Sequence, residues 1–264
     1  MKKILLAICI ILFLSGLFIF FSMEAAPVLT LPAIPQKVEP TQTNNPVIEE
    51  FNNRIVHISS LQSKASFTYY DKYINVTLKG VVHLEKPQNF RIIINSFFGN
   101  KAIDIGSNNE LFWFWSKWMN VLNWAYHKDY EKTRLKDPLH PMWLMDSFGL
   151  SKIDASKVKV QELGNQWMFV ETVKSSSGYL LRKTGFINKA TYKLDGFILS
   201  DLNGKVIASS EIKSYVGDLP KQILFNWKEE NLTLMIELGN PVKNMHNDSV
   251  FFKIPDITPK EELR

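Results

Sequence analysis

Short segments rich in β-branched and aromatic residues follow one another from residue 64 to residue 238. Gly, Asn, Asp and Pro separate these segments at intervals that are typical of antiparallel strands. The predicted strands lie at residues 64–70, 73–85, 89–97, 100–106, 110–117, 157–163, 166–173, 179–187, 192–201, 206–215, 222–227 and 232–238. Many consecutive strands with few helices between them favour one sheet that bends around its helices. We therefore predict a mainly β (α+β) chain: an incomplete antiparallel β-barrel, or strongly bent sheet, with a few helices covering its concave face.

Two segments have the periodicity of helices. The first begins at Pro46, a residue type favoured at the first helical position, and its apolar residues recur at spacings of three and four as far as Leu61. This pattern predicts a helix from 46 to about 62. The second lies within the stretch DPLHPMWLMDSFGL, where Asp137 is suited to cap a helix and Gly149 to end it. We expect this short helix to cross one face of the sheet.

The N-terminal segment has the composition of an export signal or a membrane anchor. Residues 4–22 carry no charge, and their length is close to the ~20 residues that span a bilayer as a helix. The run is longer than the about 7 to 15 apolar residues of a secretory signal, and no small-x-small cleavage site follows it. We expect residues 1–23 to be an uncleaved signal-anchor, with a cleaved signal peptide as the alternative. Lys2 and Lys3 orient the segment so that the rest of the chain lies across the membrane from the cytoplasm.

A proline-rich linker is predicted at residues 24–46, which contain five prolines and no sustained periodicity. If this segment were mostly polyproline-like, at ~3.1 Å per residue, it would hold the following domain up to about 60 to 70 Å from the bilayer. The single cysteine, Cys9, precedes the linker. The folded part of the chain therefore contains neither a disulfide bond nor a thiolate metal site.

Several classes of function lack their sequence signals. The net charge of +5 comes from 31 basic and 26 acidic residues that are scattered along the chain, which argues against binding of nucleic acid. The five histidines are scattered as well, so neither a metal site nor a cofactor is predicted. No nucleotide-binding or hydrolase motif occurs, and no nucleophile can be paired with a base. We therefore predict a protein that is not an enzyme.

The stretch ELFWFWSKW, at residues 110–118, has aromatic side chains on both faces of a predicted strand, and Trp124 follows it closely. A strand that is apolar on both faces is usually covered on both. One face is therefore expected to pack inside the bent sheet, and the other to meet a helix or an acyl chain. Both a lined cavity and a filled core are compatible with this pattern.

Six stretches together have the order and spacing of a known family. They are NNRIVHISSLQSKASFTYY (52–70), LKGVVHLEKPQNFRI (78–92), AIDIGSNNELFWFW (102–115), PLHPMWLM (138–145), YKLDGFILSDLNGKVIASSEIKSY (192–215) and VFFKIP (250–255). This pattern resembles the LolA/LolB group of bacterial lipoprotein-localisation proteins, to which the periplasmic lipoprotein carriers belong. The resemblance covers roughly residues 47 to 255. It implies a LolA/LolB-like domain at residues 47–257, followed by a C-terminal tail at 258–264.

The resemblance implies an incomplete barrel in which helices act as a lid over an apolar cavity for acyl chains. In the carrier, a basic residue before the proline of the second-strand motif helps to hold the lid closed. Lys86, before Pro87, takes that position here, although lysine lacks the planar fork of arginine. The residues expected to line the cavity come from inward positions of the strands, from the aromatic run and from the second helix. They are Phe67, Leu78, Val82, Leu84, Phe90, Ile92, Ile94, Ile103, Ile105, Phe112, Trp113, Phe114, Trp115, Trp118, Met142 and Trp143.

Two functional hypotheses follow. The first is a binding protein, anchored in the bacterial inner membrane by residues 4–22, whose periplasmic domain holds acyl chains of lipoproteins or lipids for envelope transfer. Its expected partners are an acylated lipoprotein or lipid, the inner membrane and an envelope protein. A soluble periplasmic form after signal cleavage is the alternative location. The second hypothesis is an anchored structural β-domain without a ligand cavity, similar in layout to the single-span component of the lipopolysaccharide-transport bridge.

Overall fold

One large sheet forms most of the protein, whose computed structural model describes residues 26–32, 46–70, 75–133, 141–175, 178–229, 231–245 and 249–263. The sheet has 15 strands and does not close. Its order is β15 (Lys260–Glu262), β6 (Leu122–Tyr126), β5 (Leu111–Ser116), β4 (Lys101–Ser107), β3 (Asn89–Asn95), β2 (Asn75–Glu85), β1 (Ser60–Tyr70), β13 (Leu232–Leu238), β12 (Leu219–Trp227), β11 (Val206–Val216), β10 (Leu194–Asp201), β9 (Leu180–Asn188), β8 (Gln166–Lys174) and β7 (Lys159–Leu163), and β14 (Val242–Lys243) pairs with β1. Neighbouring strands are antiparallel except β15 and β6, which are parallel.

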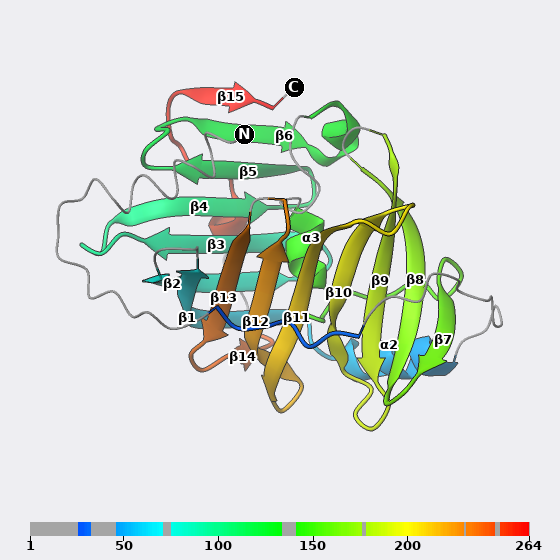
Figure 1. Cartoon of the computed structure of the whole chain (residues 1–264). Helices are drawn as coiled ribbons and strands as arrows, with labels where there is room; N and C mark the ends of the chain where they lie inside the picture. The colour runs from blue at the N-terminus through cyan, green and yellow to red at the C-terminus, as the bar shows by residue number, and fades with distance from the viewer. Residues whose placement is uncertain are drawn as a thin grey trace.

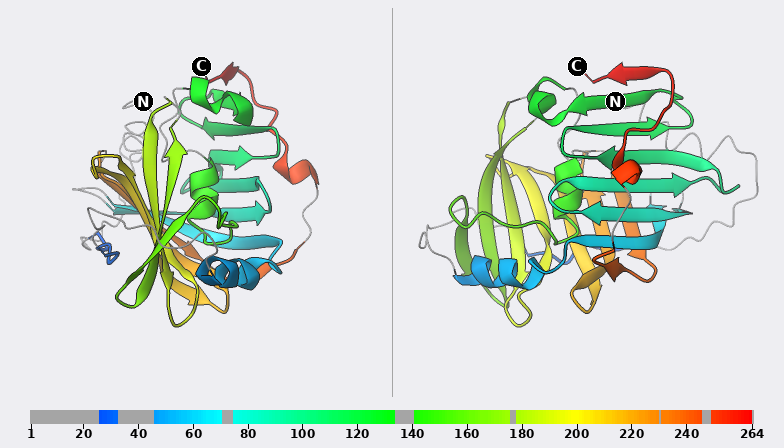
Figure 2. Two further views of the ribbon diagram at one scale, coloured as in Figure 1. Left: turned by 90° about the vertical axis from the view of Figure 1, so that its right-hand side faces the viewer. Right: turned by 180° about the vertical axis from the view of Figure 1, so that it is seen from behind.

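The sheet bends so that the strands β1–β6 and the strands β7–β13 enclose a concave face (Figures 1 and 2). Two short α-helices, α2 (Pro46–Ile55) and α3 (Pro141–Asp146), lie on that face. Two 3-10 turns, η1 (His127–Lys132) and η3 (Ser249–Phe252), complete the described elements. The predicted fold class, a mainly β chain built on an unclosed, mostly antiparallel sheet with a few helices, is confirmed.

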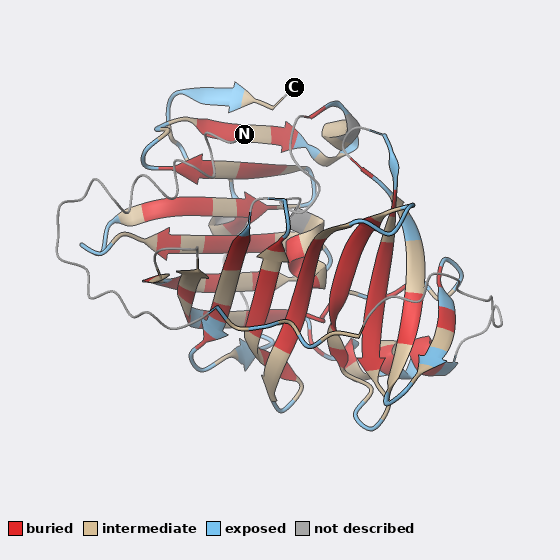
Figure 3. Ribbon diagram, viewed as in Figure 1, coloured by how far each residue is buried: buried red, intermediate tan, exposed pale blue. Residues whose placement is uncertain are grey.

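The main hydrophobic core fills the concave side. Buried residues follow the central strands, whereas exposed residues concentrate in the connecting turns (Figure 3). In β3 the alternating residues Phe90, Ile92 and Ile94 all enter this core, as the period of a strand requires. Helix α2 contributes Ile48 and Phe51, which are 0% and 1% exposed. Each such side chain stabilises the fold by about 1.5–3 kcal/mol when it leaves water.

The first helix is shorter than its apolar pattern predicts. It ends at Ile55, and β1 begins at Ser60. Ile58 and Leu61, which extended the helical pattern, are both fully buried, but they lie in the turn and in the strand, where Leu61 pairs with Leu84 of β2. Their spacing reflects burial rather than helical geometry, so the predicted end at 62 is wrong. The predicted cap of the second helix, Asp137, lies outside the described residues.

Two segments at the ends of the described chain cover outer faces of the sheet. Residues 26–32 run over the convex face of β11 and its neighbours (Figure 1). Leu31 packs there against Met168, Phe186 and Ile198, and the backbone N–H of Thr30 donates a 2.8 Å hydrogen bond to Glu211. Residues 26–32, which were expected to belong to the linker, therefore pack on the sheet.

The C-terminal segment, residues 249–263, covers the face of β3–β6 that points away from the main core (Figure 2). Ile254 and Ile257 pack on an aromatic cluster of β5, and β15 adds itself to β6. Neither β6 nor β15 was expected from the sequence, and residues 260–262 fall in the stretch expected to be a tail. The predicted membrane segment, residues 4–22, lies outside the described residues. Within the described ranges, no helix has the length and apolarity to cross a membrane.

Candidate functional site

The concave face gathers most of the residues predicted to line a cavity. The strand register brings Leu84 opposite Phe90, and Val82 opposite Ile92, on one face of the sheet. Phe67, Val82, Leu84, Phe90, Ile92, Ile94 and Ile103 are buried in the main core, and Leu78, Ile105, Phe114 and Met142 pack against it. Phe112 lies on the same face of β5 as Phe114, and its ring contacts His127 and Tyr130. In this structure these side chains pack against one another and against the helices, so most of them fill space.

Three of the predicted lining residues are not on the concave face. Trp113 and Trp115 point to the opposite side of β5, where they cluster with Leu122 beneath the C-terminal segment. Trp118 lies in the turn after β5 and is 39% exposed. The doubly aromatic strand is thus covered on both faces, and its second cover is a segment of the chain itself.

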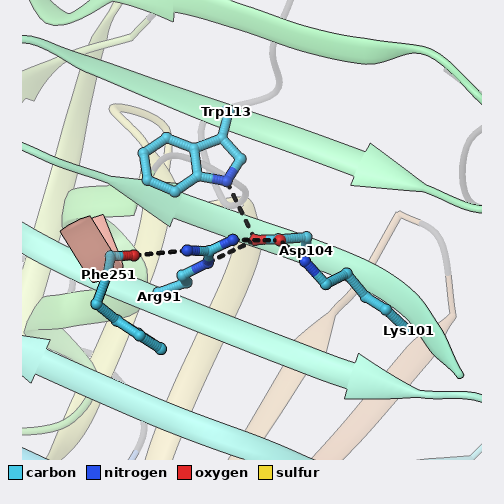
Figure 4. Close-up of polar contacts among 5 residues, drawn as sticks. All are labelled: Arg91, Lys101, Asp104, Trp113 and Phe251. Carbon is cyan, nitrogen blue, oxygen red and sulfur yellow. Dashed lines mark hydrogen bonds and ion pairs between the residues drawn. The ribbon is translucent and has the colours of Figure 1, made fainter. Parts of the chain in front are cut away.

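A buried ion pair holds the C-terminal segment on this face of the sheet (Figure 4). Arg91 donates from Nε and Nη2 to the two carboxylate oxygens of Asp104 at 3.0 and 2.7 Å, and Trp113 Nε1 donates to the same carboxylate at 3.1 Å. Burial alone would raise the pKa of Asp104, but the hydrogen bonds and charges of Arg91 and Lys101 hold it below its ordinary value. Arg91 Nη1 also donates to the carbonyl oxygen of Phe251. The cluster therefore joins the C-terminal segment to β3–β5 and serves the fold.

An open pocket remains on the concave side, where α2 ends and α3 begins; we call it the latch pocket. Its volume is about 280 Å³, at the lower end of the range for small-molecule sites. Its lining comes from the turn before β1, from the β2–β3 hairpin and from α3 with the residues after it: Ile58, Ser59, Ser60, Leu61, Leu84, Lys86, Pro87, Gln88, Met142, Met145, Asp146, Leu150, Ser151 and Lys152. The apolar residues among them continue the main core, so the pocket is an extension of the core's apolar space.

Lys86 lies at this pocket and contacts the first helix. Its Nζ atom donates a 2.7 Å hydrogen bond to the carbonyl oxygen of Ile55, the last residue of α2. A cation is favourable there because the final carbonyl groups of a helix lack partners and carry partial negative charge. Burial lowers the pKa of Lys86 from 10.5 to about 8. The contact ties α2 to the β2–β3 hairpin.

A second polar contact ties α3 to the other half of the sheet. Lys183 of β9 is only 8% exposed, and its Nζ atom pairs with Asp146 of α3 at 2.5 Å. Glu171 lies 3.9 Å from the same ammonium, which also sits over the rings of Phe197 and Trp143. Each described helix on the concave face is thus joined to the sheet by a lysine.

A second, smaller space lies on the other side of α3; we call it the Trp227 pocket. Its volume is about 30 Å³, and its lining is Trp143, Ser147, Phe197, Leu199, Ala208, Ser209, Ser210, Phe225 and Trp227. Met142 and Met145 face the latch pocket, whereas Trp143 and Ser147 face the Trp227 pocket. Helix α3 therefore lies between the two pockets.

Other places on the described chain fit a ligand less well. A wider pocket of about 410 Å³ is lined by Lys157, Lys159, Val170, Thr172 and Arg182, so its walls are mainly polar. Val170 packs with the cluster under Leu31, which places this pocket on the convex side. No group of three or more His, Cys, Asp or Glu side chains that could hold a metal ion occurs among the described residues.

Sequence reasoning missed several residues of the concave face. Among them are Lys183 and Asp146, whose contact joins two elements that are distant in sequence. One signal was available: in the strand 179–187, Lys183 shares its face with Leu181 and Ile187, both apolar and inward. A charge at an inward position indicates a buried partner. No comparable pattern in the sequence indicated that Ser210 and Trp227 line a pocket.

The comparisons with known proteins concern the fold. No protein-family model and no curated protein sequence matches the chain. Among solved structures, a domain of Vibrio parahaemolyticus named for outer membrane lipoprotein sorting matches with a TM-score of 0.53 at 10% identity, over 78% of this chain and 94% of that one. A DUF1329 family protein from Desulfovibrio piger matches with a TM-score of 0.53 at 9% identity, over 78% and 94% of the two chains.

A LolA superfamily protein from Nitrosomonas europaea matches with a TM-score of 0.51 at 9% identity, over 79% of this chain and 96% of that one. At such identities the similarity concerns the fold alone. It agrees with the resemblance in the sequence and with the unclosed sheet that wraps around α2 and α3. The chain therefore has the fold of the LolA superfamily.

Proposed function

We propose that this chain is an extracytoplasmic protein, anchored in the bacterial inner membrane, that holds acyl chains of lipoproteins or lipids on its concave face and exchanges them with the bilayer. It acts by binding and carries out no chemical reaction. The observation that carries the proposal is the latch pocket: an open, mainly apolar space of about 280 Å³ that continues the core between the end of α2 and α3. Lys86 and Lys183 join those helices to the sheet at two polar contacts.

The energetics of such a site favour exchange. A methylene group gains ~0.8 kcal/mol when it leaves water, but almost nothing when it moves from a bilayer into an equally apolar protein. The equilibrium between bilayer and protein then depends on the free energy needed to move the helices. The latch pocket is small, so a long chain requires outward movement of α3, whose Leu144 and Met145 now occupy the core. The contact of Lys183 with Asp146 opposes that movement, and the hydrogen bond of Lys86 opposes movement of α2, each by a few kcal/mol at most.

Exchange also requires contact with a bilayer, and one hairpin suits this role. Phe97 and Phe98 lie in the turn between β3 and β4 and are 75% and 68% exposed. This hairpin projects from the edge of the molecule (Figure 1). Two adjacent exposed phenylalanines are unusual on a surface that faces only water, whereas insertion into a membrane interface would bury them.

The proposed anchor would keep the domain near the membrane. Only residues 23–25 separate the apolar run 4–22 from residues 26–32, which lie on the convex face. Glu211, 5% exposed, accepts hydrogen bonds from the backbone and the hydroxyl of Thr30. Release of this segment would leave a buried carboxylate with Lys213 as its remaining charged partner. While residues 26–32 stay on the sheet, the domain would lie against the bilayer, and the reach of about 60 to 70 Å expected of a free linker would not be used.

Native mass spectrometry of the full chain, extracted from membranes in mild detergent, tests the proposal. The expected spectrum contains the protein with one acylated molecule bound. Leu84→Trp, which fills the latch pocket, should abolish binding of a fluorescent acyl probe. Ile93→Trp, on the opposite face of the neighbouring strand, should leave it unchanged. A protein that is always empty and refuses the probe would exclude the acyl-binding role.

A structural role in an envelope assembly is the second candidate, and one feature favours it. Strand β7 (Lys159–Leu163) forms an end of the sheet, and no described strand pairs with its outer edge, which could accept a strand of another protein. Photocrosslinking from Gln161 in intact cells distinguishes the two roles. A protein partner together with a lipid-free domain would support the structural role.

A further inference from the structure

Two polar side chains of the Trp227 pocket lack hydrogen-bond partners. Ser210 of β11 and Trp227 of β12 are 4% and 7% exposed. Neither the Oγ atom of Ser210 nor the Nε1 atom of Trp227 has a partner among the described residues. Ser210 pairs with Phe225 and Ala208 pairs with Trp227, so the two polar residues are diagonal neighbours on the concave face. Both side chains line the same small space.

The chemistry of this pair selects an oxygen acceptor. The indole Nε1 group can only donate a hydrogen bond, and the serine hydroxyl can donate one as well. Folded proteins seldom bury such groups without a partner, because each one loses its hydrogen bonds to water. One acceptor atom placed between them would satisfy both donors.

The walls around the pair are apolar. Trp143, Phe197 and Leu199 line the pocket, and the rings of Phe225 and Trp227 stack with centroids 5.6 Å apart and an interplanar angle of 12°. A free polar solute would gain little from such walls. An acceptor group carried by a hydrocarbon chain matches them.

The charges near the pocket disfavour an anion. Lys183 lies against the aromatic wall, with Nζ 4.6 Å from the ring centroid of Phe197. That ammonium already pairs with Asp146 and lies 3.9 Å from Glu171. One positive and two negative charges leave the cluster net negative, so a carboxylate beside it would be repelled and would also lose its hydration. The acceptor that fits is neutral.

We propose that Ser210 and Trp227 form a polar subsite that binds the carbonyl oxygen of a carboxylic ester, the group that joins an acyl chain to a lipid or to an acylated lipoprotein. This inference rests on the proposed acyl-binding function and names the group that the site recognises. The pocket of about 30 Å³ admits one water-sized group. The hydrocarbon chain therefore extends past α3 into the latch pocket, which Met142 and Met145 line on the other side of that helix.

Matched probes test the subsite on the full chain in detergent. A fluorescent fatty acyl methyl ester is compared with the alkyl ether of the same length, which lacks the carbonyl oxygen, and with the free fatty acid. The wild-type protein should bind the ester about tenfold more tightly than the ether, as two hydrogen bonds allow. It should bind the fatty acid, at a pH where it is ionised, less tightly than the ester.

Two variants and one matched control complete the test. Ser210→Ala and Trp227→Phe should bring the ester-to-ether ratio close to one while binding of the ether persists. Ser200→Ala is the control, because Ser200 pairs with Val206 on the convex face and is not part of the pocket lining. Its Oγ atom is also buried without a partner among the described residues. This control should leave the ratio unchanged, and thermal unfolding checks that each variant is folded.

The outcomes separate the subsite from the function on which it rests. If the wild-type protein binds ester and ether equally well, the two donors bind only water and the subsite is excluded, although acyl binding stands. An ester-to-ether ratio that Ser200→Ala lowers as much as Ser210→Ala, or a preference for the fatty acid, would also overturn the subsite. If none of the three probes binds, the proposed function itself fails.

Discussion

The Nζ atom of Lys86 donates a 2.7 Å hydrogen bond to the carbonyl oxygen of Ile55, where α2 ends beside the latch pocket. The contact spans the first helix and the hairpin between β2 and β3, so the helix cannot move away without breaking it. The resemblance to the lipoprotein carriers placed a latch at this residue, and its role in a lid remains a proposal. Lysine provides a point charge here, without the planar fork of arginine.

Loss of this contact should speed the entry of ligand. Lys86→Met retains the apolar stem but removes the donor, so we expect about tenfold faster uptake of a fluorescent acyl probe. A hydrogen bond from a charged donor contributes about 1.5–3 kcal/mol, and part of this is screened because Lys86 is half-buried. Stopped-flow fluorescence gives the rate. Lys86→Arg is the control and should remain as slow as the wild type; equal rates for all three proteins would rule out a latch at this position.

The pH dependence of uptake should have a definite sign. Burial lowers the pKa of Lys86 from 10.5 to about 8 in the latched form, whereas an opened form exposes the group and restores its ordinary value. Between these values the latched form binds fewer protons, so rising pH favours it. We expect uptake to slow as the pH rises from about 8 to 10.5, with no contribution from this group below pH 8. Lys86→Met should abolish this slope, and uptake that accelerates over the same range would contradict the assignment.

The ion pair of Asp146 and Lys183 should stabilise α3 on the sheet. Asp146→Ala leaves a lysine that is 8% exposed with only Glu171 nearby, at 3.9 Å. We expect the free energy of unfolding to fall by about 2–4 kcal/mol, since removal of one partner leaves a buried charge. The double variant Asp146→Leu with Lys183→Met should be less destabilised than Asp146→Leu alone. Urea unfolding measures these variants together with Lys183→Met alone, and additive effects of Asp146→Leu and Lys183→Met would show that the two side chains are not coupled.

The two faces of the aromatic strand should respond differently to substitution. Trp113→Phe removes the hydrogen bond from Nε1 to the buried Asp104, so we expect a loss of about 1.5–3 kcal/mol in stability. Faster proteolysis within residues 249–263 should accompany it. Phe114→Leu changes the concave face and should weaken binding of the acyl probe. If Trp113→Phe weakens probe binding as much as Phe114→Leu, the division between the two faces is wrong.

The sequence predicted those features whose cause is local. In β3 the alternation of Phe90, Ile92 and Ile94 follows directly from the geometry of a strand. The covering of both faces of β5 could also be inferred, because aromatic residues occupy both. What covers the second face could not, since Ile254 and Ile257 meet Trp113 across more than 130 residues of chain.

The errors have related causes. The helical spacing that continues to Leu61 belongs to a buried turn and a strand, because burial alone can imitate a helical period. In the candidate site, Lys86 was singled out from its motif, and the structure places it beside the latch pocket. The pair of Lys183 and Asp146 depends on the meeting of β9 with α3, which no local pattern records. The open space of the latch pocket is likewise a property of the packed structure, since only packing decides whether apolar residues fill a volume or line it.

Photocrosslinking in native membranes tests the central claim, that acyl chains occupy the concave face, most directly. A diazirine amino acid is placed at Leu84, in the latch pocket, or at Ile93, on the opposite face of the adjacent strand. Irradiation followed by mass spectrometry of the labelled peptides identifies what each position contacts. We predict adducts with an acylated lipid or lipoprotein at position 84 and none at position 93. Adducts at neither position, or equally at both, would contradict an acyl-binding concave face.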